Sequence, residues 1–338
     1  TPCIHHPKTH AIVKLLRALI DCYQLPMVLL SETNVPHHEN ISYFGNGDEA
    51  HMVYNFALPP LVLHAAISGD AAPLRDWARD LEYPDEGLFL NFLASHDGIG
   101  LTPAKGLVDE KSFAASLERG VERGAHISTK ATDDGPIPYE LNCSWLSAVA
   151  PPSLGLPHHR ARAFLATHAV LLSLRGVPAI YFNSLFGFEN WDEGPAIRGY
   201  NRAINREKPR LEDFEARLAD PQGLSFLVYS GLSRLLSYRS AHPAFSPDIP
   251  QRILPTDGAL FALVRGPDEE GESILCAMNL GPWPAAFEWP TTEGADSAMQ
   301  TEGEGRQETI SSIHISLEPW QTRWIPMDGT LLRLEDEL

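Results

Sequence analysis

Two segments of the chain place a carboxylate directly after a short apolar run. Residues 92–98 read Phe-Leu-Ala-Ser-His-Asp-Gly, so His96 and Asp97 follow apolar and small residues. Residues 27–31 end in the same way at Glu32. Short apolar runs of this kind are typical of buried parallel strands. Either carboxylate alone is also suited to capping a strand or a turn, whereas two carboxylates at strand ends are the pair that cleavage of a glycosidic bond requires.

The elements that must position these groups alternate between helix and strand. The apolar spacing predicts helices over residues 11–22, 58–68, 73–81, 111–123, 160–174 and 224–238, and buried strands over residues 27–31, 53–57, 88–95 and 176–182. In a (β/α) barrel, polar groups at the carboxyl ends of the strands carry out the chemistry. A closed barrel needs eight strand–helix units, and these residues supply about four of them. The sequence therefore predicts an α/β fold that contains half of a barrel.

The pattern changes near residue 245, which predicts a second domain. Residues 1–244 are expected to form the C-terminal half of a catalytic (β/α)8 TIM barrel. Within it, residues 99–157 form a long excursion, and such an excursion after a catalytic strand is typical of a lid or a substrate-binding wall. Residues 245–338 lack helical spacing and contain short strand-like runs, so we expect a small antiparallel β-sandwich domain there.

The composition narrows the possible partners. The 338 residues carry a formal net charge of −18, and the phosphates of nucleic acids or an anionic membrane surface would repel such a chain. No apolar run of about 18 residues is present, so no membrane span is expected. The four cysteines lie far apart without a Cys-x-x-Cys pair, which favours a reducing cytoplasm. Adjacent histidines at 5–6, 37–38 and 158–159 lack the spacing of metal ligands, so neither a metal ion nor a cofactor is expected.

Five short motifs carry a resemblance to a known family. They are Ser-Glu-Thr-Asn at 31–34, Ser-His-Asp-Gly-Ile-Gly at 95–100, Tyr-Glu-Leu-Asn at 139–142, Gly-Val-Pro-Ala-Ile-Tyr at 176–181 and Arg-Ala-Ile-Asn-Arg at 202–206. With them, nearly the whole chain resembles the C-terminal part of the sucrose phosphorylase subfamily of the α-amylase family, glycoside hydrolase family 13. That resemblance implies a (β/α)8 barrel followed by a small β domain.

The resemblance assigns the glucosyl side of a site to four residues. Glu32 resembles the general acid/base, which protonates the leaving oxygen and then deprotonates the incoming phosphate or alcohol, and which needs a dry, crowded environment. Asp97 resembles the third carboxylate of the family, which binds sugar hydroxyls. His96 and Arg202 match residues that hold the same glucosyl ring.

The acceptor side departs from the sucrose-specific pattern. Tyr139 and Glu140 match a mobile loop that lines the acceptor and phosphate side, where sucrose phosphorylases usually carry Tyr-Gln. His38 follows the acid/base motif and is a further candidate for substrate contact. These departures resemble the glucosylglycerate and glucosylglycerol phosphorylase branch, whose acceptors are a small acid or polyol other than fructose.

The covalent nucleophile of the family has no counterpart in this sequence. The family places it in an Arg-x-Asp motif, and no Arg-x-Asp occurs here. Residues 3–7, Cys-Ile-His-His-Pro, match the stretch that follows that motif, and the first methionine is Met27. We therefore expect the nucleophile to lie upstream of Thr1, and the chain alone to be inactive.

The resemblance thus implies a hexosyltransferase, a retaining α-glucosyl phosphorylase. Its substrates would be a small α-glucoside and inorganic phosphate, and its product α-glucose 1-phosphate. Two alternatives remain open at the level of sequence: a hydrolase or transglucosylase of the same fold, and a non-catalytic, sugar-binding partner subunit. The sequence gives no indication of an oligomeric state.

Overall fold

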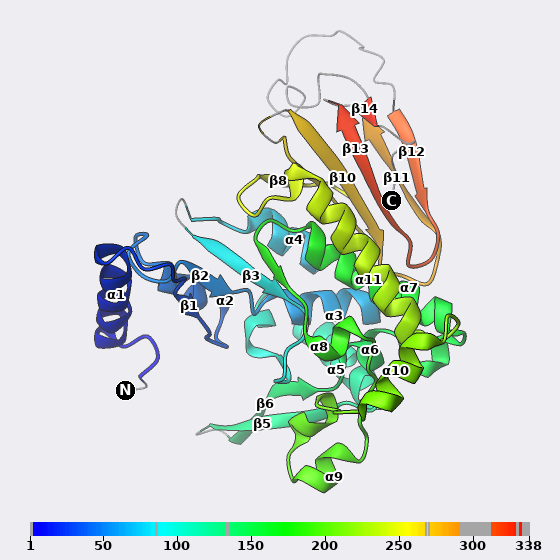
Figure 1. Ribbon diagram of the computed structural model, residues 1–338, viewed down its shortest axis with the longest axis horizontal. Helices are drawn as coiled ribbons and strands as arrows, with labels where there is room; N and C mark the ends of the chain where they lie inside the picture. Colours follow the sequence, from blue (N-terminus) through cyan, green and yellow to red (C-terminus); the bar gives the residue numbers. More distant parts are fainter. Residues whose placement is uncertain are drawn as a thin grey trace.

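A parallel sheet organises the N-terminal part of the protein (Figure 1). The structure, a computed structural model, describes residues 3–84, 87–132, 135–267, 269, 271–290, 312–328 and 331–332. Four strands stand in the order β1 (Leu30–Ser31), β2 (Met52–Tyr54), β3 (Leu88–Phe92) and β7 (Val177–Ala179). All adjacent pairs are parallel, so their carboxyl ends meet at one edge. This arrangement matches the half barrel expected from the sequence.

Buried helices cover this sheet. They are α3 (Leu58–Ser68), α4 (Ala72–Asp80), α7 (Pro157–Ser173) and α11 (Leu224–Ala241). Helix α3 is apolar nearly all round, and α7 is buried along most of its length; both contribute most of their apolar side chains to the main core. A helix that is apolar on every side must be enclosed, and α7 packs along α11 as well as beneath the C-terminal strands. The predicted helices at 58–68, 73–81, 160–174 and 224–238 are therefore confirmed within a few residues.

Helix α1 (Pro7–Cys22) leaves its apolar stripe in solvent. Its N-terminus is capped by the His6 ring, which accepts a hydrogen bond from the backbone N–H of Lys8 at 3.1 Å. The helix lies at the left edge of the molecule in Figure 1, and only Ile20 on it is buried. The stripe consists of Ile12, Leu15, Leu16 and Leu19. An exposed apolar stripe of this size is a surface that other apolar groups can cover.

The prediction of a buried strand over residues 27–31 was wrong in both length and burial. Only Leu30 and Ser31 form a strand, and Met27 and Val28 are more than half exposed. The physical reason is position: β1 is the edge strand of its sheet and pairs with β2 alone. A strand with a neighbour on one side only loses half of the contacts that would bury it.

The excursion at 99–157 is more regular than the sequence suggested. It contains a small antiparallel sheet in the order β4 (Ile99–Gly100), β6 (Gly135–Asn142) and β5 (His126–Thr132). Its helical parts are η2 (Thr102–Ala104), α5 (Glu110–Glu122), α6 (Trp145–Val149) and η3 (Pro152–Leu154). The segment after β7 is also largely helical, with α8 (Phe182–Leu185), α9 (Gly194–Arg198), η4 (Asn201–Asn205) and α10 (Leu211–Ala219). The remaining short elements near the N-terminus are α2 (His37–Asn40) and η1 (Ile41–Phe44).

The C-terminal part is a β-sandwich, as predicted. One sheet has the order β14 (Leu331–Leu332), β13 (Thr322–Asp328), β10 (Glu272–Asn279), β9 (Leu260–Arg265) and β8 (Gln251–Ile253), and the second pairs β11 (Ala285–Pro290) with β12 (Ser312–Leu317). Along β9, Leu260, Ala262 and Val264 face a small core between the sheets. The alternate residues Phe261 and Leu263 belong to the main core. This period of two lets one sheet serve two cores.

Arg265 joins the sandwich to the rest of the protein. The turn η5 (Pro243–Phe245) leads into this region. The fully buried guanidinium donates to the carbonyl of Ser173 at 3.0 Å and to those of Ser246 and Ile249 at 2.6 and 3.1 Å. Burial lowers the pKa of Arg265 to about 10. These three hydrogen bonds offset part of the cost of burying the charge, and they bind β9 to the end of α7. The division at 244/245 stays a prediction, since the main core runs across it.

Within the described residues, two cysteines, Cys143 and Cys276, are buried, and two, Cys3 and Cys22, are exposed; all four are free thiols. None of the helices in these ranges is long and apolar enough to cross a lipid bilayer. The same part of the chain holds no cluster of three or more histidine, cysteine or acidic side chains placed to bind a metal ion.

Candidate active site

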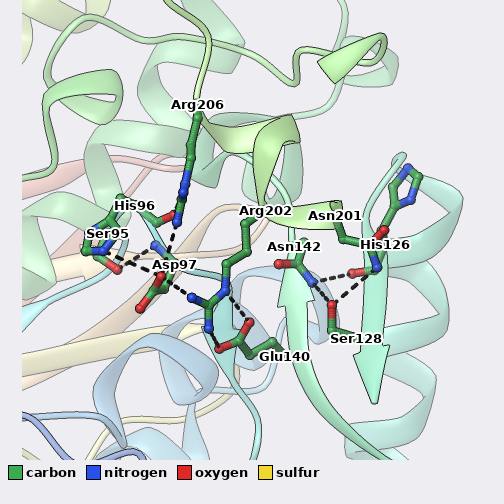
Figure 2. Close-up of polar contacts among 10 residues, drawn as sticks. All are labelled: Ser95, His96, Asp97, His126, Ser128, Glu140, Asn142, Asn201, Arg202 and Arg206. Atoms are coloured by element: carbon green, nitrogen blue, oxygen red, sulfur yellow. Dashed lines mark hydrogen bonds and ion pairs between the residues drawn. The ribbon is translucent and has the colours of Figure 1, made fainter. Parts of the chain in front are cut away.

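Arg202 connects two carboxylates that are far apart in the sequence (Figure 2). Its Nη1 donates to Asp97 Oδ1 at 2.6 Å. Its Nε and Nη2 donate to the two carboxylate oxygens of Glu140 at 3.0 and 2.6 Å. The fork of two parallel bonds fixes the plane of the guanidinium. The hydrogen bonds that Arg202 donates to Glu140 raise the pKa of Arg202, so this side chain is a permanent cation.

The turn η4 holds Arg202 and Arg206 at the strand ends. Asn205 Nδ2 donates to the carbonyl of Ser95 at 2.7 Å, and the Tyr181 hydroxyl donates to the carbonyl of Asn205 at 3.0 Å. Arg206 Nε donates to the carbonyl of His96 at 2.6 Å, and its Nη2 reaches Asp97 Oδ1 at 3.3 Å. The turn is therefore tied both to the segment after β3 and to the segment after β7. As a result, Asp97 Oδ1 accepts hydrogen bonds from both Arg202 and Arg206.

Gly98 allows the strand-end loop to lie against β6. A Cβ atom at this position would come within 2.8 Å of Asn142 Oδ1 and 3.0 Å of Glu140 Cβ. Any residue with a side chain would push the two segments apart. The close approach keeps Glu140, of which only 4% is exposed, beside Asp97 and Arg202. Next to it, Asn142 Nδ2 donates to Ser128 Oγ at 2.8 Å (Figure 2).

Glu32 follows β1 at the same edge of the sheet. A Cβ atom at Gly100 would lie 2.6 Å from Asn34 Oδ1, so the segment after β1 touches β4. Burial and, second, the charge of Glu32 raise the pKa of Tyr54 at the end of β2. Glu32 itself is exposed. The expected dry environment is thus missing in the described part of the chain, because β1 has no second neighbour there.

The other predicted residues lie around this centre with different exposure. His96 Nε2 is 3.6 Å from Asp97 Oδ1, and most of its side chain is exposed. Burial and, second, the Glu140 carboxylate raise the pKa of Tyr139. His38 is 80% exposed and approaches Glu39 at 3.9 Å, so nothing in its contacts directs it to the centre.

Several polar atoms at this edge find no hydrogen-bond partner among the described residues. They include Ser31 Oγ, Asn55 Oδ1 and Asn142 Oδ1, all buried. A buried polar atom without a partner is costly, and three of them next to the strand ends mark a place that accepts polar groups. Asn55 and Asn142 were not singled out by their residue type, although both follow strand-like runs.

The site has further residues that the sequence analysis missed. Tyr54 packs edge-on against Phe92 with ring centroids 5.3 Å apart, and Phe56 completes this aromatic cluster. Asn205 serves as the anchor of η4. Its spacing was a usable signal, because Arg202, Asn205 and Arg206 stand at i, i+3 and i+4 and therefore share one face of a helical turn. The pairing of Glu140 with Arg202 had no signal in local spacing.

Sequence comparisons find relatives over most of the chain. It is 48% identical over 281 residues to the glucosylglycerate phosphorylase of Spirochaeta thermophila, covering 83% of this chain and 48% of the relative. It is 39% identical over 328 residues to the glucosylglycerate phosphorylase of Escherichia coli K12, covering 96% of this chain and 57% of the relative. The chain thus spans about half the length of the curated relatives it matches. No profile of a protein family matches it.

A solved structure has the same fold. The crystal structure of sucrose 6F-phosphate phosphorylase from Thermoanaerobacter thermosaccharolyticum matches with a TM-score of 0.66 and 22% identity, over 81% of this chain and 52% of that chain. The half barrel followed by a β-sandwich is accordingly the fold of the α-amylase family, glycoside hydrolase family 13. Together, the sequence matches and this fold show a chain similar to glucosylglycerate phosphorylases and to a sucrose-type phosphorylase. The resemblance expected from the motifs is confirmed.

Proposed function

We propose that this chain supplies the acid/base side of a retaining α-glucosyl phosphorylase. The reaction would transfer the glucosyl group of a glucosylglycerate-type α-glucoside to inorganic phosphate, giving α-glucose 1-phosphate. The observation that carries the proposal is the similarity to glucosylglycerate phosphorylases at 39–48% identity. The site supports it, because Glu32 and Asp97 follow the carboxyl ends of parallel strands and Arg202 of η4 donates to Asp97.

In this proposal Asp97 and Arg202 hold the glucosyl ring. The guanidinium stays charged and fixed by Glu140, so it can orient Asp97 without rearranging. Glu140 then acts as a positioning residue for Arg202, in addition to the acceptor role that its motif implies. Glu32 protonates the leaving oxygen and, in the second step, takes the proton of phosphate. His96 is placed beside Asp97 to contact the same ring.

A cavity beside this centre suits an anionic acceptor. Its volume is about 760 Å³, and His96, Arg206, Lys208, Tyr181 and Phe182 are among its lining residues. The basic side chains of Arg206 and Lys208 suit the carboxylate of a glyceryl group or a phosphate, because charge-assisted hydrogen bonds to such groups are strong. Glu207 also lines this cavity, and Arg206 already faces Asp97 at 3.3 Å, so an anionic acceptor would join an existing ion pair.

The test compares Glu32→Gln with Glu118→Gln in the gene product that contains these residues. Glucosylglycerate and phosphate are the substrates, and α-glucose 1-phosphate is measured. We expect Glu32→Gln to lower kcat by a factor of about 100 or more on this substrate, and to matter less for α-glucosyl fluoride, whose leaving group needs no proton. Glu118 is an exposed glutamate of α5 and controls for the loss of one charge.

Two outcomes would contradict the proposal. Equal loss on both substrates would deny Glu32 its acid/base role. Release of free glucose alone in excess phosphate would indicate a hydrolase. The 338-residue chain by itself is expected to show no turnover, because it holds no Arg-x-Asp, and measurable product from that chain would refute this point.

A further inference from the structure

A second groove lies between the helical part of the protein and the β-sandwich. Its volume is about 600 Å³. One wall comes from the ends of α3 and α5, with Arg119 and Arg123, and the other from the loops at 257–260 and 281–286. None of its lining residues belongs to the candidate active site. Cavities of this volume accept small organic ligands.

Trp283 stands at the rim of this groove and is 77% exposed. Its neighbours are Pro282 and Pro284, which restrict the backbone of the loop. The fully buried Asn279 holds the loop from below: its Nδ2 donates to the carbonyl of Trp283 at 2.7 Å, and its Oδ1 accepts from the N–H of Gly281 at 3.0 Å. The indole of Trp283 is therefore exposed to solvent on a loop whose backbone conformation is already fixed.

The opposite rim is held just as firmly. Arg75, which is itself buried, donates through Nη1 to the carbonyls of Gly258 and Leu260 at 3.0 and 2.7 Å. The N–H of Leu280 donates to the carbonyl of Ala259 at 3.0 Å, which joins the two rims. A large exposed aromatic ring in a preformed groove has a lower ordering cost on binding than one on a mobile loop.

The polar groups of the groove include both donors and acceptors. Arg119 Nη1 donates to the carbonyl of Ile67 at 3.1 Å, and Arg123 Nη1 to that of Ala148 at 2.6 Å. These bonds occupy one nitrogen of each side chain, and a guanidinium has five N–H donors. Asp257 adds an exposed carboxylate that only accepts.

We propose that this groove is a saccharide-binding site, in which a neutral sugar ring lies on the indole of Trp283 and its hydroxyls bond to Asp257 and the two arginines. A sugar has an apolar ring face, which suits an aromatic ring, and hydroxyls that both donate and accept. A phosphate or other small anion would be repelled by Asp257 and by the net charge of −18. An apolar peptide would leave the arginines and the carboxylate desolvated without partners. The proposal goes beyond the phosphorylase reaction and does not depend on it.

The experiment is a titration with maltotriose, a neutral α-linked trisaccharide, monitored by ¹⁹F NMR of the gene product labelled with 5-fluorotryptophan. The signal of Trp283 is assigned by its loss in Trp283→Phe. We expect this signal to shift and saturate as maltotriose is added. In calorimetry, with enough glucosylglycerate present to fill the active site, we expect Trp283→Ala and Asp257→Asn each to weaken maltotriose binding by about tenfold. Tyr23→Ala, which removes another exposed aromatic ring, should leave the affinity unchanged.

Three results would overturn the proposal. The first is a Trp283 signal that maltotriose does not move. The second is a shift caused by inorganic phosphate instead and abolished by Arg119→Ala, which would make the groove an anion site. The third is unchanged affinity in Asp257→Asn together with Trp283→Ala. None of these depends on α-glucose 1-phosphate formation, so failure of the phosphorylase assay and failure here are separate results.

Discussion

Replacing Arg202 by methionine should cost far more stability than replacing its partner Glu140 by glutamine. Arg202→Met leaves the Glu140 carboxylate, only 4% exposed, without its two hydrogen bonds. Removing one partner of a buried ion pair costs about 3–5 kcal/mol. Because 39% of the Arg202 side chain is exposed, water can partly solvate the gap, so we expect about 3 kcal/mol. Glu140→Gln keeps the shape and one acceptor, and should cost about 1 kcal/mol.

The assay is urea unfolding of the two single variants and the double variant. The double variant carries no unpaired carboxylate, so it should be nearly as stable as Glu140→Gln, which gives a coupling energy of about 2–3 kcal/mol. Arg210→Met removes an arginine whose side chain is 81% exposed and should change the free energy of unfolding by less than about 0.5 kcal/mol. Additive effects, or a loss from Arg202→Met no larger than that control, would refute the description of Arg202 as a clamp between carboxylates.

Two further predictions concern buried groups. His168 is buried against Phe164, and burial lowers its pKa from 6.5 to about 4. Between these two pH values the unfolded chain binds a proton at this histidine that the folded chain excludes. The free energy of unfolding should therefore fall as the pH drops from about 6.5 to about 4, by about 2 kcal/mol at pH 5. Urea unfolding of His168→Gln should lack this loss, and an unchanged pH profile would contradict the assignment. In a thiol titration with Ellman's reagent, the exposed Cys3 and Cys22 should react quickly. Cys143 and Cys276 should react only after unfolding, because burial raises the pKa of each thiol to about 12. Four fast-reacting thiols would contradict the burial of Cys143 and Cys276.

Much of the fold could be predicted because periodicity reports burial directly. The high apolar content of α3 and α7 and the short apolar runs of β9 and β10 are local properties of the chain. Residues 27–31 show the limit of that signal: they have the apolar composition of a buried strand, yet most of them lie in solvent. Burial depends on what stands beside a strand, and composition says nothing about the neighbour.

The site was predictable where its members follow strands, and unpredictable where contacts cross the chain. Glu32 and Asp97 could be found as carboxylates after apolar runs. The bond from Arg202 to Glu140 spans 62 positions and depends on the close approach at Gly98, which no local pattern encodes. The buried Oδ1 atoms of Asn55 and Asn142, which have no hydrogen-bond partner among the described residues, were likewise hidden, because asparagine after a strand is common in ordinary turns.

The buried Arg265 has a consequence for how such a protein can change over time. The chain alters its character near residue 245, which looks like a natural joint for exchanging one module for another. However, the guanidinium of Arg265 sits on carbonyls of Ser173, Ser246 and Ile249, on both sides of that joint. A transplanted sheet without a matching arginine would leave those carbonyls bare, and a transplanted Arg265 without them would bury an unpaired charge. We therefore expect the sandwich and the half barrel to tolerate exchange only as one piece, and not as two interchangeable parts.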